Sequence, residues 1–257
     1  MTRRQILYLA HRIPYPPDKG DKIRTWNTLE HLTYRFDVHL AAFVDDPADF
    51  QHEAHLKGVC ASVSLVGLNR IAATLRSLSG FLTGEPLTTP YYRDARMMRA
   101  VKAARRNNLV AEIGFSSSMA PYLLNGGGSA RKIIDLCDAD SAKWTAYSHA
   151  RRGLTRSVYA REGRLLAVEE TRIINAADAA FAISEEEADL LGQRDGVQRE
   201  VFYFGNGVDT EFFAPGASPA PVKGIDVVFE RKMIIGECRC CHVVCKRYAL
   251  FLYAFVI

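Results

Sequence analysis

Short apolar runs that alternate with helical patterns restrict the fold of this sequence more than any other feature. Apolar runs typical of strands lie at 5–10, 37–44, 59–66, 109–115, 131–136, 179–183, 200–204 and 224–229. Helical patterns lie after Asp21 and at 46–56, 69–82, 91–106, 117–124, 141–177 (with a break at Gly153) and 185–191. Strands that alternate with helices build a parallel sheet covered on both faces. We therefore predict a Rossmann-like α/β domain.

Charge and hydropathy exclude several classes of protein. The chain has 33 Lys and Arg against 29 Asp and Glu, a balance too even for a protein that binds nucleic acid over its whole surface. No apolar run reaches the ~20 residues that span a bilayer, and the N-terminus lacks the pattern of a signal peptide. Only Cys60 and Cys137 precede the cysteines of the tail, which fits a reducing compartment. We expect a cytoplasmic protein.

The loop after the first strand is the first candidate site. In a parallel sheet, ligands bind beyond the carboxyl ends of the strands, beside the N-termini of helices. Here Gly20 would allow the backbone to approach a ligand, and Lys19, Lys22 and Arg24 would neutralise an anion such as a phosphate. The loop carries no Walker or G-x-G-x-x-G pattern, so a proline-rigid turn with a solvated charge cluster explains the same residues equally well.

Two later strands are also followed by polar residues. Ser116 ends the strand predicted at 109–115, and Asp138 and Asp140 follow the strand predicted at 131–136. A carboxylate there could accept hydrogen bonds from sugar hydroxyls or act as a base. The alternative is that Asp140 or Ser141 caps the next helix, which is the commoner role of such residues.

Two basic segments offer a second kind of surface. Arginine and lysine recur at helical spacing at Arg93, Arg96, Arg99, Lys102 and Arg106, and again at Arg151, Arg152, Arg156, Arg161 and Arg164. Either face could contact anionic lipid head groups at the inner side of the cell membrane. A solvated helix face is the default interpretation where no apolar face rich in Trp or Phe accompanies the charges.

Five segments together resemble one enzyme family. They are PPDKGDKIR (16–24), SSSMAPYL (116–123), DADSAKW (138–144), ISEEEADLL (183–191) and NGVDTEFF (206–213). In this order they resemble the N-terminal half of a family-4 glycosyltransferase of the two-lobed GT-B fold, and the match covers roughly residues 5–230. Sugar transferases associated with exopolysaccharide and PEP-CTERM systems are the most similar members.

The resemblance implies a division of labour between two lobes. The N-terminal lobe, here 1–213, would hold the acceptor, often a lipid-linked sugar. The donor lobe would hold the nucleotide sugar and the EX7E carboxylates, and transfer would retain configuration without a metal or a further cofactor. Gly20 would face the cleft near the donor phosphates, and Asn206, Gly207 and Asp209 would lead from one lobe to the other. Many relatives have a histidine where this sequence has Asp138, so the role of that position stays open.

The remaining residues do not resemble a donor lobe. Residues 214–231 have the composition of a linker followed by one strand, and only 26 residues follow Arg231, with no EX7E pair. We interpret 232–257 as a frameshifted tail, because a one-base shift of codons that encode 234–249 can give a sequence like the start of a donor lobe. A zinc site at the cysteines of 238–245 and a membrane anchor at 248–257 are the alternatives. We expect a truncated acceptor lobe that is inactive alone, served by a separately encoded donor lobe, or else a non-catalytic half-domain that binds sugars.

Overall fold

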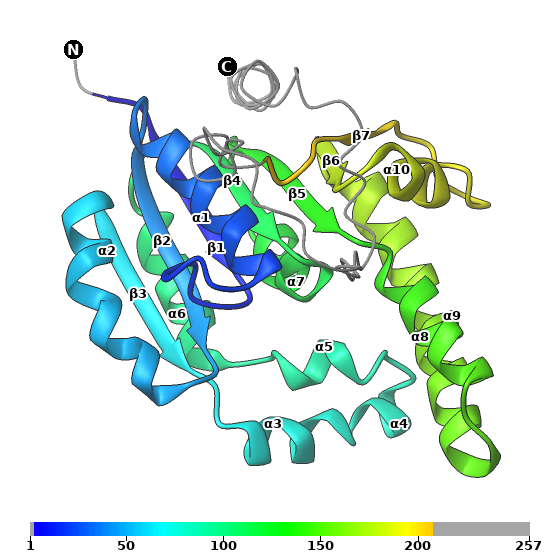
Figure 1. Ribbon diagram of the computed structural model, residues 1–257. Helices are drawn as coiled ribbons and strands as arrows, with labels where there is room; N and C mark the ends of the chain where they lie inside the picture. The colour runs from blue at the N-terminus through cyan, green and yellow to red at the C-terminus, as the bar shows by residue number, and fades with distance from the viewer. Residues whose placement is uncertain (1–2, 208–257) are drawn as a thin grey trace, which may run out of the picture.

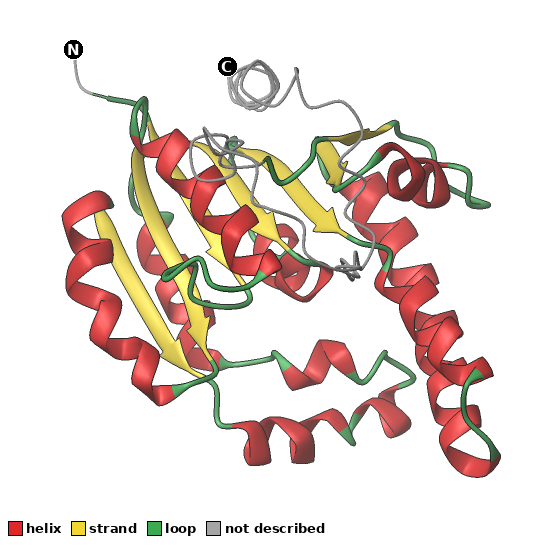
Figure 2. Ribbon diagram, viewed as in Figure 1, coloured by secondary structure: helices red, strands yellow, loops and turns green. Residues whose placement is uncertain are grey.

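A seven-stranded sheet forms the centre of the protein. The computed structural model describes residues 3–207, and its strands lie in the order β3-β2-β1-β4-β5-β6-β7 (Figures 1 and 2). All neighbouring strands are parallel. The strands are β1 (Gln5–Ala10), β2 (Asp37–Val44), β3 (Ser62–Gly67), β4 (Leu109–Phe115), β5 (Arg131–Cys137), β6 (Ala179–Ala182) and β7 (Val201–Tyr203). The predicted Rossmann-like α/β fold is confirmed.

Helices cover both faces of this sheet, because successive side chains of each strand point to opposite sides. Ile6 and Tyr8 of β1 pack in one core cluster with α1 and α2, whereas Leu7 and Leu9 pack in the other with α6, α7, α9 and α10. The helical elements are η1 (Pro47–His52), η2 (Ser117–Met119), α1 (Gly20–Thr33), α2 (Glu53–Val59), α3 (Arg70–Ser77), α4 (Gly80–Thr83), α5 (Thr88–Tyr91), α6 (Ala95–Ala104), α7 (Ala120–Leu124), α8 (Asp140–His149), α9 (Gly153–Ala176) and α10 (Glu185–Gly192).

Three predicted boundaries were wrong. The strand predicted at 59–66 begins only at Ser62, because Val59 ends α2. The helix predicted at 91–106 begins only at Ala95, because Tyr91 ends α5 and Asp94 caps α6 through its side chain. The helix at 69–82 is divided into α3 and α4. The strand predicted at 224–229, the linker at 214–231 and the tail at 232–257 lie outside the described residues.

Helices α8 and α9 form a hairpin that extends away from the sheet (Figure 1). The hairpin is closely packed at Gly163 of α9, where an added Cβ would lie 2.5 Å from the Thr145 Oγ1 atom of α8. It is tied to the helical layer of α3, α4 and α5 by Glu162, whose carboxylate accepts hydrogen bonds from the backbone N–H groups of Leu87 and Thr88. The predicted break at Gly153 is confirmed, since α9 begins there with a positive φ of 63°.

Candidate functional site

The order of the strands reverses between β1 and β4, so the loops at the carboxyl ends of these two strands are the expected place for a ligand. The chain leaves β1 toward β2 on one side and returns to β4 on the other. At such a switch point the two outgoing loops diverge and leave space for a ligand. His11 and Arg12 follow β1, Ser116 follows β4, and Asp138 follows β5.

Lys19 and Lys22, which the sequence suggested as two similar anion contacts, have different surroundings in the structure. Lys19 is exposed and precedes the first turn of α1, where its ammonium group is open to an anion. Lys22 is 2% exposed and donates to Asp49 at 2.9 Å, with Asp18 at 3.5 Å. A Cβ at Gly20 would meet no atom within 4 Å, so the surrounding protein does not require glycine there. Lys19 and Gly20 therefore remain candidates for ligand contact, whereas Lys22 is itself buried and paired with carboxylates.

The structure gives Arg24 a different role from the predicted contact with phosphate. Its side chain is 1% exposed, and Nε and Nη2 donate to the two carboxylate oxygens of Asp135 at 2.8 and 3.0 Å. The remaining N–H groups donate to the carbonyl oxygens of Phe204 and Ala182 and to Asn206 Oδ1. All five donors of the guanidinium are thus used inside the protein. Arg24 joins α1 to β5, β6 and the end of the described chain.

A charged cluster that the sequence did not predict lies at the end of β1. Asp21 Oδ2 lies 2.6 Å from Arg12 Nη1 and 3.6 Å from His11 Nε2. Arg12 Nε also donates to Asp45 at the end of β2. The His11 ring lowers the pKa of Asp21 well below its usual range; partial burial opposes this effect and Arg12 reinforces it. The helix expected after Asp21 begins one residue before it, so that Lys19 is the N-cap residue and Asp21 lies in the first turn.

His11 is the residue of this cluster with a free site for hydrogen bonding. Its ring stacks on Phe115 of β4, with centroids 5.5 Å apart, and meets the edge of Tyr92. Nδ1 is buried and has no hydrogen-bond partner among the described residues. A buried polar nitrogen without a partner costs free energy, and a ligand hydroxyl would remove that cost. The signal for His11 in the sequence was its place, directly after the first strand.

Asp21 should make stability depend on pH. Because the folded protein holds its pKa below the unfolded value of about 4, ionised Asp21 stabilises the fold above about pH 4, and this contribution is lost as pH falls further. We expect Asp21→Asn to flatten the fall in unfolding free energy between pH 6 and pH 3, as measured by urea denaturation at each pH. An unchanged slope in the variant would contradict this assignment, and Asp18→Asn on the exposed loop is the control.

Strained backbone marks the ends of β4 and β5. Ser116 has φ of 78° and Cys137 has φ of 63°, a region that residues other than glycine rarely adopt. Each such residue costs about 1–3 kcal/mol, and residues of this kind often cluster at functional sites. The Ser116 hydroxyl lies 3.0 Å from the Ser118 hydroxyl, and Ser117 Oγ donates to Asp140 Oδ2 at 2.9 Å. The strained turn thereby carries a serine that orients the Asp140 carboxylate.

The two aspartates after β5 share a lysine. Lys143 Nζ lies 3.3 Å from Asp140 Oδ1 and 3.6 Å from Asp138 Oδ2. Burial opposes the charged form of Lys143, yet both carboxylates raise its pKa above the usual value. The capping alternative was wrong for both residues: Ala139 precedes α8 without a side-chain cap, and the Ser141 hydroxyl donates to Glu170. Asp138 is the more exposed of the two aspartates, with 44% of its side chain open to solvent.

The residues predicted to join the lobes lie partly at the limit of the described chain. Asn206 Oδ1 accepts from Arg24 Nη1 at 3.4 Å, and Asn206 O accepts from the Asn27 amide. Gly207 has φ of 74°, which only glycine adopts without strain. Asp209 and the cysteines of the tail lie outside the described residues. Within 3–207, no three His, Cys, Asp or Glu residues are grouped so that they could hold a metal ion.

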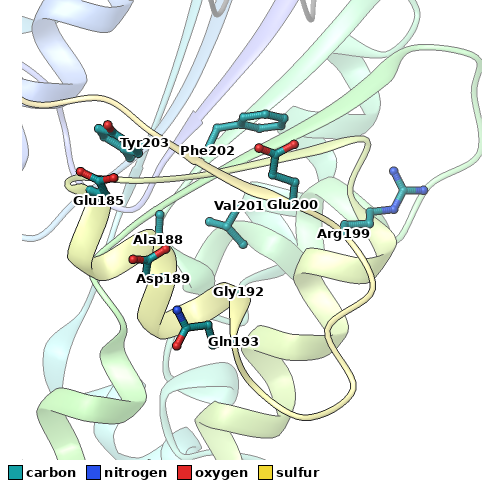
Figure 3. A pocket seen from close by; sticks show the side chains of 10 residues that line it. All are labelled: Glu185, Ala188, Asp189, Gly192, Gln193, Arg199, Glu200, Val201, Phe202 and Tyr203. Atoms are coloured by element: carbon teal, nitrogen blue, oxygen red, sulfur yellow. The ribbon is translucent and has the colours of Figure 1, made fainter.

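A groove of about 530 Å³ lies between α10 and the edge strand β7, several strands away from the switch point (Figure 3). Its walls include the carboxylates of Glu185, Asp189 and Glu200 and the guanidinium of Arg199, with Val201 between them. The sequence did not indicate it, because the residues belong to a helix and to an edge strand. Its carboxylates are dispersed along the groove in Figure 3, which makes it a useful control surface rather than the candidate site.

Several arginines of the two predicted basic segments are engaged with other groups of the protein. Arg93 and Arg96 are paired with Glu85 and Asp94. Arg161 donates to the carbonyl oxygens of Gly80 and Glu85, so it belongs to the packing of α9 against α4. None of the helices in the described part of the chain is long and apolar enough to cross a membrane.

Comparisons with known proteins give only distant structural matches. No protein-family model matches the sequence, and no curated protein does. A UDP-glucosyltransferase from Polygonum tinctorium capable of glucosylating indoxyl has 12% identity and a TM-score of 0.46, over 79% of this chain and 52% of that one. The N-terminal domain of trehalose-6-phosphate phosphatase from Candida albicans has 14% identity and a TM-score of 0.42, over 81% and 49%. TcCGT1 in complex with UDP has 14% identity and a TM-score of 0.40, over 79% and 50%. The chain spans about half the length of these structures, and likeness at this level assigns neither a family nor an activity.

Proposed function

We propose that this chain is the acceptor-binding lobe of a nucleotide-sugar-dependent glycosyltransferase. The acceptor would be a sugar or a lipid-linked sugar, and the reaction a hexosyl transfer in the synthesis of exopolysaccharide or a lipid-linked glycan. The observation that carries the proposal is the set of groups at the switch point: the unpartnered His11 nitrogen, the strained Ser116 turn and the oriented Asp140 carboxylate. The five sequence segments that resemble family-4 glycosyltransferases support it independently.

These groups suit the recognition of a sugar hydroxyl. Asp140 is fixed by Ser117 and Lys143 and retains acceptor capacity for hydroxyl donors. His11 Nδ1 adds a second polar contact on the β1 side, and the Phe115 ring beneath it limits the motion of the imidazole. Asp138 and Ser116 would contact more distant hydroxyls, and exposed Lys19 would meet a phosphate of the donor or of a lipid-linked acceptor. These residues all lie at or just after the carboxyl ends of β1, β4 and β5.

Transfer itself would need a donor lobe that binds the nucleotide sugar. We propose that another polypeptide supplies that lobe, and that the chain alone binds acceptor without transferring sugar. The intact enzyme would retain configuration at the transferred sugar and use no metal. We place the protein in the cytoplasm, in peripheral contact with the membrane.

Binding of a short acceptor mimic tests the proposal. We expect hexyl β-glucoside to receive saturation at its sugar-ring protons in saturation-transfer NMR with the full chain, and 1-hexanol to receive much less. Asp140→Asn and His11→Phe should each weaken the sugar signal about tenfold, which corresponds to loss of one charged or buried hydrogen bond. Asp189→Asn in the α10–β7 groove is the matched control and should leave the signal unchanged. Equal signals in all four proteins would overturn the proposal.

A further inference from the structure

An exposed apolar stripe runs along α3 and α4. It consists of Ile71, Leu75, Leu78, Phe81 and Leu82, whose exposed fractions are 77%, 65%, 52%, 46% and 91%. Four of these residues follow one another at helical spacing, and the opposite side of α3 buries Ala73 in the core. Single exposed leucines are ordinary, but a contiguous apolar face on a helix marks an interaction site.

Basic residues outnumber acidic ones along α3, α4 and the hairpin, with Arg70 paired to Asp45 and Glu85 following α4. The sequence contains no Asp or Glu from Arg70 to Gly84, and none from Ser141 to Arg161 along the hairpin. At the hairpin tip, Arg151, Arg152 and Arg156 are exposed, and no ion pair in the described part of the chain engages them. Leu154, 82% exposed, lies among them. Apolar side chains flanked by unpaired arginines suit the boundary between acyl chains and anionic head groups.

Side-chain contacts join the stripe to the α8–α9 hairpin. Arg161 of α9 donates to the carbonyl oxygens of Gly80 and Glu85, and its guanidinium lies over the Phe81 ring at 5.0 Å. Figure 1 shows α4 beside the lower part of the hairpin, and the strand arrowheads point toward the layer of α3, α4 and α5. The apolar and basic groups are therefore held at the same end of the molecule as the candidate site.

We infer that the stripe on α3 and α4, together with the arginines of the α8–α9 tip, docks on an anionic lipid bilayer. The stripe inserts Leu75, Leu82 and their neighbours among the upper acyl chains, and Arg151, Arg152 and Arg156 contact lipid phosphates. This inference rests on the peripheral membrane contact of the proposed function and gives it a site, on a surface apart from the His11–Asp140 edge that would bind the acceptor. A protein that docked in this way would bring its switch-point edge close to acceptors embedded in the membrane.

Vesicle sedimentation of the full chain tests this docking. We expect phosphatidylcholine vesicles that contain phosphatidylglycerol to bind the chain at least about tenfold more tightly than pure phosphatidylcholine, and high salt to remove most of that difference. Combined Ile71→Gln, Leu75→Gln and Leu82→Gln should weaken binding at least about tenfold, because the stripe no longer inserts. Combined Arg151→Gln, Arg152→Gln and Arg156→Gln should abolish the preference for phosphatidylglycerol.

The controls separate docking from general surface properties. Val168→Gln with Leu190→Gln removes exposed apolar side chains elsewhere, and Arg99→Gln with Arg106→Gln removes exposed charges elsewhere. Both should bind vesicles like the wild type. Leu82→Gln alone, at a side chain 91% exposed, covers the case in which the triple variant fails to fold. Undiminished vesicle binding by the stripe variants would overturn the inference. It would also be overturned if the wild type formed a dimer that bound neither vesicle type and the stripe variants were monomeric. If the wild type binds the glucoside but not the vesicles, the docking inference has failed. If it binds the vesicles but not the glucoside, the proposed acceptor site has failed.

Discussion

Replacing Arg24 by methionine should lower the free energy of unfolding by about 3–5 kcal/mol, the range expected when one partner of a buried ion pair is removed. Asp135, 4% exposed, would lose the guanidinium that now donates to both of its oxygens. The carbonyl oxygens of Phe204 and Ala182 would also lose a donor. The effect should therefore extend from α1 to the last described strand.

Urea denaturation of a variant series separates the ion pair from simple packing. Arg24→Lys keeps the charge but not the paired hydrogen bonds, so its cost should be intermediate. Arg24→Met with Asp135→Leu should recover part of the loss, because no uncompensated charge remains inside. If the double variant is as unstable as the sum of the single variants, the two side chains do not act as a pair.

A side chain at Gly163 should have the second large effect. An added Cβ would lie 2.5 Å from Thr145 Oγ1 and 3.0 Å from both Ser141 O and Thr145 N, so α8 and α9 must move apart. We expect Gly163→Val to cost about 1–3 kcal/mol, the usual cost of overpacking a close contact. Thermal and urea denaturation of the purified variant measure this loss.

A second glycine in a helix supplies the control. A Cβ at Gly58 of α2 would meet nothing within 4 Å, so Gly58→Ala should be neutral or stabilising by up to about 1 kcal/mol through helix propensity. Gly163→Ala with Thr145→Ala should recover only the part of the cost that comes from the hydroxyl, since the backbone atoms of α8 stay in place. Equal stability of the Gly163 and Gly58 variants would show that the hairpin is not closely packed there.

Periodicity and turn residues predicted most of the fold. The strands at 5–10, 37–44 and 109–115 have the predicted bounds, because charged or polar residues mark the ends of their apolar runs. The helix predicted at 185–191 also begins where expected, with Ser184 as its N-cap residue, whose hydroxyl accepts from the Glu187 N–H. The boundary at 59–66 was wrong because Val59 suits the buried face of a helix as well as a strand. A short apolar run carries no information that separates the two.

The candidate site was less predictable, because partners distant in sequence decide the role of each charge. Lys22 and Arg24 resembled the exposed charges of a phosphate loop, yet both side chains are buried, Lys22 beside the partly buried Asp49 and Arg24 beside the buried Asp135. Asp140 was singled out by its place after a strand, whereas its partner Ser117 is brought to it by the strained Ser116 turn, which the sequence does not reveal. The sequence predicted a helix over the stripe of α3 and α4, but it did not indicate that the apolar side chains of this stripe are exposed.

Mapping the bound glucoside on the full chain tests the central claim most directly. Amide chemical shifts should be followed by NMR while hexyl β-glucoside is added to the wild type and to Asp140→Asn. We expect the largest shifts at 11–12, 116–118 and 138–141, the three strand ends around the switch point, and their loss in the variant. Shifts confined to the α10–β7 groove would contradict the assignment of this lobe as an acceptor site. The absence of any shift at mimic concentrations high enough to saturate the site would contradict it as well.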